Sequence, residues 1–575
     1  MCAAPKSEAR PEPALRPPEA VMTPEALSAF KASRLSFFRH VIGRMVRERW
    51  RIETVARALD ARGRGTVVYR LENPGRPLHF VVFSDELPEA RRTDRIIENH
   101  YDGEAFLCFG EVTEARIQAQ RGQFADFLTG RADIETLGWT RVNRSSRVFE
   151  AVVSALAAGR QPDPELLAGA GYLVRNNGFW GNGRHGSASL QAFPPGAFLA
   201  APYHADLLTL FLWRHFSHDL VEHMARARNP SGAAVLAPEV KRFIGVGNAS
   251  GLGLVPFVIR HPLRVDHWVR AREIAIARLM AVPARASDPE VARLAALLDR
   301  AVAYYASGVQ VRAGIFQGSA GQVADLEHLR AALAEFRGRG TIAGEAAERP
   351  WAALAAWAEG HLHREGLELL HSLLIEVYPE RIGDLEGDIP QIVDDATDVD
   401  PAMRVGDLHA LVRRDYDWAL AIDLSAPEAR RHFWYLSEDN LEPRHGLRSV
   451  DPGEEFETFV DVVGEVQALA EALACFDPAS PVAAFLFAHP EHRQTVERVQ
   501  ATRHAPYGEV RTNVLAADFE PCHLIRFLLT QYGMEKLDPQ SRLWVRGTFL
   551  QGAPVAEDLA AGHEPDWLFP LPPAS

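Results

Sequence analysis

The stretch Thr66-Val67-Val68-Tyr69-Arg70-Leu71, followed by Leu78-His79-Phe80-Val81-Val82-Phe83, carries the clearest fold signal in this chain. Both runs are rich in β-branched and aromatic residues, which are typical of strands. Between them, Asn73-Pro74-Gly75 supplies the residue types that form tight turns. The pattern predicts a β-hairpin, and Ala105-Phe106-Leu107-Cys108-Phe109 is a candidate third strand.

Helical patterns surround this hairpin. Thr23-Pro24-Glu25 has the form of a helix start, with Thr as N-cap and Pro at the first helical position, and an arginine-rich helical region is expected from there to about residue 61. Residues 145–158 have helical periodicity, and residues 165–374 are expected to be mainly helical. The sequence therefore predicts a mainly α protein with α+β portions.

We expect four segments along the chain. Residues 1–22, rich in Ala, Pro, Glu and Arg, are predicted to form a disordered leader. Residues 23–164 are predicted to be a small N-terminal α+β domain with the hairpin, and residues 165–375 a central helical domain with two glycine-rich loops. Residues 376–575 are expected to be a mixed C-terminal domain, with strand-like pieces at residues 482–487 and 543–545.

Composition limits the partners that the chain is expected to have. The formal net charge is −14, which argues against general affinity for nucleic acid or an anionic membrane, so an anionic ligand would need a locally basic pocket. No run approaches the roughly 18 apolar residues of a membrane span. Cys2, Cys108, Cys475 and Cys522 show no C-x-x-C spacing, and free thiols predict a cytoplasmic protein.

The first glycine-rich segment, residues 175–187, reads Arg-Asn-Asn-Gly-Phe-Trp-Gly-Asn-Gly-Arg-His-Gly-Ser. Guanidinium groups bind carboxylate or phosphate, and asparagine and glycine favour turns, so this segment is a candidate substrate loop. The candidate binding residues in it are Arg175, Asn176, Asn177, Asn182 and Arg184. His185 is a candidate acid or base, because the adjacent Arg184 favours a neutral ring. The alternative is a structural loop with inward-packed aromatic residues.

The second segment, Gly245-Val246-Gly247-Asn248-Ala249-Ser250-Gly251-Leu252-Gly253, resembles a phosphate-binding loop only loosely, because Ser250 stands where the third glycine of G-x-G-x-x-G belongs. Asn248 or Ser250 is the predicted N-cap of a helix over residues 252–259, and both are candidate binding residues. We expect residues 175–187 and residues 248–253 to lie within about 15 Å of each other, since one anion would need both. The alternative is that these small residues only allow close packing.

Between the two segments, His204 and Asp206 are further acid–base candidates at the start of a predicted helix. His204, His215, His218 and Glu222 share a face of that helix, and Glu368-x-x-His371 forms a second His/Glu pattern, but neither has the spacing of a known metal motif. We therefore predict no metal ligands in the site.

These residues favour a metabolic enzyme that binds a small polar or anionic substrate through Arg, Asn and Gly-rich loops and uses histidine for acid–base chemistry. The first alternative is a non-catalytic helical scaffold or interaction protein, and a lesser one is a metal-dependent enzyme with His/Glu helix faces. Neither the reaction class, a cofactor nor the oligomeric state follows from the sequence.

Overall fold

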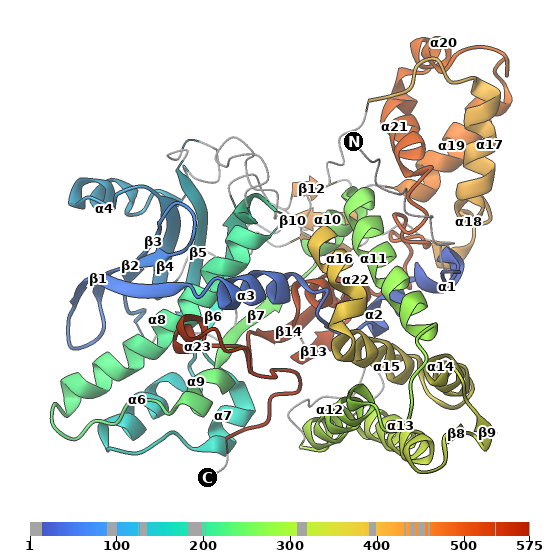
Figure 1. Ribbon diagram of the computed structural model, residues 1–575. Coiled ribbons are helices and arrows are strands. Elements are labelled where there is room, and N and C mark those ends of the chain that lie inside the picture. The colour runs from blue at the N-terminus through green and yellow to red at the C-terminus, as the bar shows by residue number, and fades with distance from the viewer. Residues whose placement is uncertain are drawn as a thin grey trace, which may run out of the picture.

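A nine-stranded sheet organises the fold, with strand order β1-β2-β3-β4-β5-β6-β7-β14-β13 (Figure 1). All neighbouring strands are antiparallel except β6 and β7, which are parallel. The strands are β1 (Arg51–Leu59), β2 (Gly65–Glu72), β3 (Leu78–Ser84), β4 (Gly103–Phe109), β5 (Thr136–Arg144), β6 (Tyr172–Gly181), β7 (Gly245–Ser250), β13 (Lys536–Ser541) and β14 (Trp544–Phe549). The computed structural model describes residues 14–88, 101–124, 126, 131, 135–181, 198–201, 203–307, 319–389, 398–429, 433–436, 443–446, 455–457, 461–534 and 536–573.

The expected mainly α fold is wrong. Helices hold 53% of the chain and strands 15%, and nine of the strands form one large mixed sheet. The predicted hairpin is confirmed as β2 and β3, and the third candidate strand is β4. Two of the strands that sequence analysis missed, β6 and β7, lie in the glycine-rich segments, and β7 pairs with β14 from the far end of the chain, so local periodicity gives little sign of them. The sheet takes strands from all three long segments that we predicted as separate domains.

The predicted arginine-rich helix divides into three elements. Thr23 is the N-cap of α2 (Pro24–Ala29), and its Oγ1 accepts a hydrogen bond from the N–H of Ala26 at 3.3 Å. After α3 (Phe37–Arg47) the chain enters β1 instead of continuing the helix. β1 is an edge strand that is largely exposed, so its charged residues resemble those of a solvated helix face.

Helices pack on both faces of the sheet. α8 (His204–Arg228) lies along one face, where Trp213 packs so closely on β4 that a Cβ atom at Gly103 would lie 2.6 Å from its ring. That Cβ atom would also lie 3.4 Å from Val142 of β5, so Val142 points to the α8 face. On the opposite face, α4 (Glu114–Gln120) contributes Ile117 to an apolar cluster that includes Trp139.

The other half of the molecule is helical (Figure 1). The remaining helices that frame the sheet and the helical half are α1 (Pro18–Val21), α6 (Phe149–Ala157), α7 (Pro164–Ala170), α9 (Pro238–Phe243), α10 (Leu254–Arg260), α11 (Pro262–Met280), α12 (Pro289–Ala306), α13 (Ser319–Arg339), α14 (Pro350–His361), α15 (Arg364–Val377), α16 (Pro379–Asp388), α22 (Pro521–Tyr532) and α23 (Ala556–Ala561). In the helical half, α15 packs against both α11 and α12, and α22 packs against α2 and β14.

A separate group of helices projects at the upper right of Figure 1. It consists of α17 (Val405–Asp415), α18 (Asp417–Leu420), α19 (Val462–Ala474), α20 (Val482–Ala488) and α21 (Arg493–Thr502). The predicted strand at residues 482–487 is wrong, because this apolar run forms α20. A short apolar run of this kind fits a strand or a buried helix equally well. The strand predicted at residues 543–545 is confirmed as part of β14.

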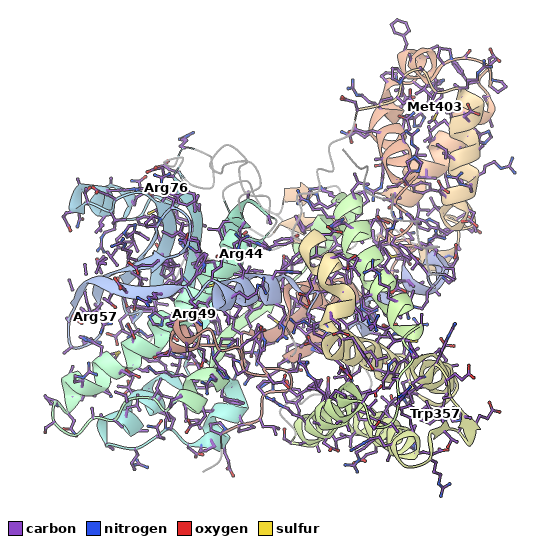
Figure 2. The ribbon with its side chains drawn as sticks, in the orientation of Figure 1. Arg44, Arg49, Arg57, Arg76, Trp357 and Met403 are labelled. Atoms are coloured by element: carbon purple, nitrogen blue, oxygen red, sulfur yellow. The ribbon has the colours of Figure 1, made fainter. Side chains whose placement is uncertain are left out.

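Arginines of α3 and β1 form ion pairs, one within the helix and one with α8. Figure 2 labels Arg44, Arg49 and Arg57 in this region. Arg44 pairs with Glu48 at 2.7 Å, and Arg57 of β1 pairs with Asp219 of α8 at 2.6 Å. Across the described ranges, we find no helix with the length and apolar character needed to cross a lipid bilayer.

Candidate functional site

The first glycine-rich segment is a strand where the structure describes it. Arg175 and Asn176 are buried in β6, and Asn177 lies in the same strand. Asn182, Arg184 and His185 lie outside the described residues.

The second glycine-rich segment is β7, so the prediction that Asn248 or Ser250 caps a helix is wrong. α10 begins later, at Leu254, with Gly253 as its N-cap. Small residues are required here by close packing. A Cβ atom at Gly245 would lie 2.2 Å from the carbonyl oxygen of Phe549 in β14, and one at Gly247 would lie 2.7 Å from the ring of Tyr172.

The two glycine-rich segments nevertheless meet. The Nδ2 of Asn248 donates a hydrogen bond to Oδ1 of Asn176 at 3.3 Å, and Nδ2 of Asn176 donates to Oγ1 of Thr140 at 2.7 Å. Ser250 extends the chain of bonds through its Oγ, which donates to Oδ1 of Asn248 at 2.6 Å. Thr140 lies two residues before Val142 in β5, so these polar side chains face α8.

His204 and Asp206 lie in the first turn of α8 and are fully buried. The Nδ1 of His204 donates to the carbonyl oxygen of Phe198 at 2.9 Å. Burial, with a smaller contribution from Arg44, lowers the pKa of His204 to about 3, so the ring is neutral but a weak base at pH 7. Burial raises the pKa of Asp206 to about 8, so Asp206 is a protonated acid at neutral pH.

On the two helix faces that we considered for metal binding, the carboxylates bind cationic side chains instead. Glu222 lies 3.4 Å from Nζ of Lys241. Glu368 accepts hydrogen bonds from Arg16 at 2.6 Å and from Arg272 at 2.7 Å. A carboxylate held between two guanidinium groups is already neutralised and is a poor ligand for a divalent cation.

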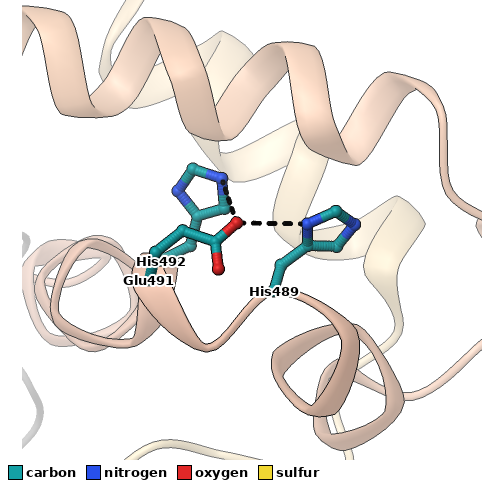
Figure 3. A group of neighbouring side chains, drawn as sticks. All are labelled: His489, Glu491 and His492. Atoms are coloured by element: carbon teal, nitrogen blue, oxygen red, sulfur yellow. Dashed lines mark hydrogen bonds and ion pairs between the residues drawn. The ribbon is translucent and has the colours of Figure 1, made fainter.

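One other group of side chains has the spacing of metal ligands, and within the described ranges it is the only such group (Figure 3). Glu491 Oε1 lies 3.3 Å from Nδ1 of His489 and 4.0 Å from Nε2 of His492. The three residues follow α20, and the Glu491 side chain is 62% exposed. A carboxylate between two imidazoles at the surface is already satisfied as an ion-pair cluster, so we do not assign a metal to it.

Another group of buried polar side chains lies around Ala32, where they line two adjoining cavities. We call the first the Lys536 cavity. It has a volume of about 400 Å³, counting space open to solvent. Its lining residues come from the chain after α2, from α3, α12, β13 and β14, and from the C-terminal segment: Ala32, Ser33, Arg39, Tyr304, Gly533, Lys536, Thr548, Leu550, Gln551, Trp567, Leu568 and Pro570.

Several polar atoms at the Lys536 cavity are buried without a hydrogen-bond partner in the described part of the chain. They are Nη1 of Arg39, Nε2 and Oε1 of Gln551, and Nε1 of Trp567. The Arg39 guanidinium also lies 4.6 Å from the Trp567 ring, and its Nη2 bonds Glu376 at 3.0 Å. Because buried polar groups are normally hydrogen-bonded, such a concentration indicates that water or a ligand completes the site.

We call the second the Lys31 cavity, which shares Ala32 with the first. It has a volume of about 430 Å³, again counting space open to solvent. It is lined by Phe30, Lys31, Ala32, Tyr305, Leu369, Arg526, Thr530, Met534, Leu537 and Phe569. Arg526 of α22 is only 6% exposed, and Lys31 is half-buried. Two cations therefore line this space.

The electrostatics of both cavities disfavour protonated amines. Burial, assisted by the neighbouring charge of Arg526, lowers the pKa of Lys31 to about 7. Burial likewise lowers the pKa of Lys536 to about 8, against a partial opposing effect of Asp538. A bound anion would reverse both effects, because it favours the charged amine.

Comparison with known proteins adds no relative. No protein-family model, no curated protein and no solved structure matches this chain. The functional argument therefore depends on the chemistry of the two cavities.

Sequence analysis missed both cavities, although two signals were present. The chain has only four lysines, Lys6, Lys31, Lys241 and Lys536, among 62 basic residues, and two of the four line the cavities. Arg526 interrupts the apolar run of α22, where its neighbours are Ile525 and Phe527. An arginine in an apolar helix face needs a specific partner or a functional reason.

Proposed function

We propose that this protein is an enzyme that binds a small anionic substrate in the Lys31 and Lys536 cavities. The observation that carries the proposal is the convergence of Lys31, Arg39, Arg526 and Lys536 on two adjoining cavities in a chain with a net charge of −14. These cavities provide the locally basic pocket that an anionic ligand would need in such a chain.

The pKa values of the two lysines support an enzyme over a scaffold. Ionisable groups with strongly perturbed pKa values concentrate at catalytic and binding sites. Burying a cation without a counter-ion opposes folding, so a purely structural protein would gain stability by replacing Lys31 with an apolar residue. The free thiols of Cys108, Cys475 and Cys522 are compatible with a cytoplasmic enzyme.

The proposal is tested by ligand-induced stabilisation of the purified full chain. Inorganic phosphate and a set of small mono- and dicarboxylates are titrated at constant ionic strength, and a ligand at 100 times its Kd should stabilise the fold by about 2.7 kcal/mol. Calorimetric titration then gives the Kd. Phosphate also stabilises proteins without binding, so the comparison is between variants at one concentration.

Lys536→Gln and Lys241→Gln form a matched pair for this test. Lys536 lines the cavity, whereas Lys241 of α9 lies outside it and pairs with Glu222 and Glu557. We expect Lys536→Gln to weaken anion binding at least tenfold and Lys241→Gln to leave it unchanged. Equal binding by wild type and both variants would place the anion elsewhere and contradict the proposal.

A second candidate places acid–base chemistry at the start of α8, as the sequence suggested. It is favoured by the buried Oδ1 of Asp206, which has no hydrogen-bond partner in the described residues and belongs to a carboxyl group that stays protonated at pH 7. The bonded side chains of Asn176 and Asn248 face the same helix. If this candidate is right, Asp206→Asn abolishes turnover without weakening anion binding, once a substrate is known.

A further inference from the structure

A third cavity lies where α10, α11 and α22 meet the start of α3, and we call it the Gln531 cavity. Its volume is about 460 Å³, counting space open to solvent. Small-molecule sites have volumes of about 300–1,000 Å³. The cavity shares no lining residue with the Lys31 and Lys536 cavities, so it is separate from the anion site proposed above.

Aromatic rings form much of the wall of this cavity, and they come from Phe37, Tyr203, Phe257 and Trp268. The ring of Tyr203 packs against two of the others, with centroids 5.1 Å from Phe37 and 5.9 Å from Phe257. The Trp268 indole is fixed, because its Nε1 donates a hydrogen bond to the carbonyl oxygen of Leu35 at 3.0 Å. These rings provide apolar faces against which a planar ligand can pack.

The backbone of Tyr203 has an unfavourable conformation. Its φ is 65° and its ψ is −10°, which lies in the left-handed region that bulky residues rarely adopt. Tyr203 is also the N-cap of α8, and its side chain lines the cavity. Strained residues of this kind concentrate at binding and active sites.

Gln531 of α22 brings a free carboxamide to the cavity. The residue is 5% exposed, and its side chain makes no hydrogen bond within the described part of the chain. Gln500 of α21 is almost equally buried, but its carboxamide accepts a hydrogen bond from the N–H of Asp400 at 2.7 Å and donates one to the Asp400 carbonyl oxygen at 3.2 Å. Because buried amides are normally satisfied in this way, a free one at a cavity wall indicates that water or a ligand completes it.

We propose that the Gln531 cavity binds a planar ring that carries a hydrogen-bond donor next to an acceptor, as an aromatic carboxamide or a nucleobase does. A carboxamide side chain offers an acceptor oxygen and an NH₂ donor side by side, so it pairs with such an edge through two parallel hydrogen bonds. The aromatic wall contacts the faces of the ring and Gln531 fixes its orientation, which is the usual division of roles in a small-molecule site.

Binding of four probes to the wild-type full chain tests this inference: benzamide, adenine, toluene and benzoate. Benzamide and adenine carry both the ring and the edge, toluene lacks the edge, and benzoate replaces the amide with a charge. Arg264 also lines the cavity, and benzoate reports whether this arginine selects the ligand instead. Ligand-observed NMR titration gives each Kd. We expect benzamide or adenine to bind, and the tighter of the two distinguishes an aromatic carboxamide from a nucleobase.

A pair of variants links the binding to Gln531. Gln531→Leu removes the amide at similar volume, so we expect it to weaken benzamide and adenine binding about tenfold and leave toluene binding unchanged or stronger. Gln118→Leu is the matched control, because Gln118 is an exposed amide of α4 that bonds Glu114 at 2.8 Å, and it should change none of the four Kd values. Thermal melting shows whether each variant folds, and Gln531→Met repeats the test if Gln531→Leu does not.

Three results would overturn the inference. Neither benzamide nor adenine binds to wild type, or benzoate binds more tightly than benzamide, or the Gln531 variant keeps its affinity for benzamide and adenine or loses as much for toluene. None of these results bears on the Lys31 and Lys536 cavities, because phosphate binding tests that anion site separately.

Discussion

Two clusters of buried charge lie side by side in the helical half of the molecule, and they differ in how their charges are balanced. The first, which we call the ion network, consists of Arg16, Arg272, Glu273 and Glu368. The second is the Lys31 cavity with Arg526. Phe30 belongs to both, because it lines the cavity and its ring lies 4.1 Å from the Arg272 guanidinium.

The ion network combines charges of both signs, whereas the charged lining residues of the Lys31 cavity are of one sign. Each carboxylate of the network contacts guanidinium groups, with Glu273 bound by Arg16 at 2.7 Å and Glu368 bound by Arg272 at 2.7 Å. In the cavity, both charged lining residues are cations. Buried charges are tolerated when they are paired, so the network is complete as a structural device, whereas the cavity lining contains no carboxylate of its own.

Breaking the ion network should give the largest effect. Burial alone would raise the pKa of Glu368, but Arg16 and Arg272 outweigh it and hold this pKa well below the ordinary value. Glu368→Gln leaves both arginines without this charge, and we expect a loss of about 3–5 kcal/mol in the free energy of unfolding. Chemical denaturation measures it, with Glu365→Gln as the control on the same helix, where a change below about 1 kcal/mol is expected. A small effect at Glu368 would mean that the network is not structural.

Asp206 provides a second test, because it is a buried acid with no paired cation. Its pKa is about 8 in the folded protein and about 3.8 when unfolded, so the folded state holds a proton that the unfolded state loses between these values. Stability conferred by this proton is present below about pH 4 and is lost as the pH rises through 8. We expect wild type to lose about 3–4 kcal/mol between pH 5 and pH 8 through this group, and Asp206→Asn to lose correspondingly less. Parallel pH profiles of wild type and variant would contradict a buried neutral acid.

The local parts of the fold could be predicted from the sequence, and the long-range pairing could not. The β2–β3 hairpin and the Thr23 cap follow from residues within a few positions of each other. β7 does not, because its glycines are explained only by the approach of Phe549 and Tyr172 from other strands. β1 resembles a helix face since one edge of the sheet tolerates charged residues.

The same difference between local and long-range contacts explains which parts of the candidate site could be predicted. Sequence reasoning concentrated on contiguous polar segments and correctly expected residues of β6 and β7 to approach each other, as the bond between Asn176 and Asn248 shows. The Lys31 and Lys536 cavities instead draw single residues from segments hundreds of positions apart, such as Arg39 and Lys536. The scarcity of lysine and the position of Arg526 in an apolar helix are signals in the sequence, but only the tertiary structure reveals that the cations converge.

Removing Arg526 should affect binding in the cavity more than stability. We expect Arg526→Gln to weaken the binding of inorganic phosphate by about 1.5–3 kcal/mol, which is the range for a hydrogen bond to a charged group. Burial already lowers the pKa of Arg526, so loss of its charge should not lower the thermal midpoint by more than a few degrees. Arg278→Gln, which removes a surface pair with Asp384, is the control for binding. Unchanged phosphate affinity together with extensive unfolding would mean that Arg526 stabilises the fold, as the arginines of the ion network do, and does not bind the anion.

The smallest expected effect is the change in the free energy of unfolding when Lys31 is replaced. Its sign should be opposite to that of the change at Glu368 in the ion network. The pKa of Lys31 is about 7 in the folded protein, against 10.5 as the ordinary value, so the unfolded state binds more protons between these pH values and stability rises with pH there. Below pH 7 the full cost of the buried charge is present, and Lys31→Met should therefore raise the free energy of unfolding by about 1–2 kcal/mol at pH 6, with a gain that fades toward pH 10.

Lys241→Met is the matched control with the opposite sign, because burial tends to lower the pKa of Lys241 but Glu222 and Glu557 raise it overall. Melting curves of both variants at pH 6 and pH 9 measure the difference. If Lys31→Met is stabilised and no longer binds phosphate, the amine is kept at the expense of stability. If Lys31→Met is destabilised, Lys31 is paired like the arginines beside it.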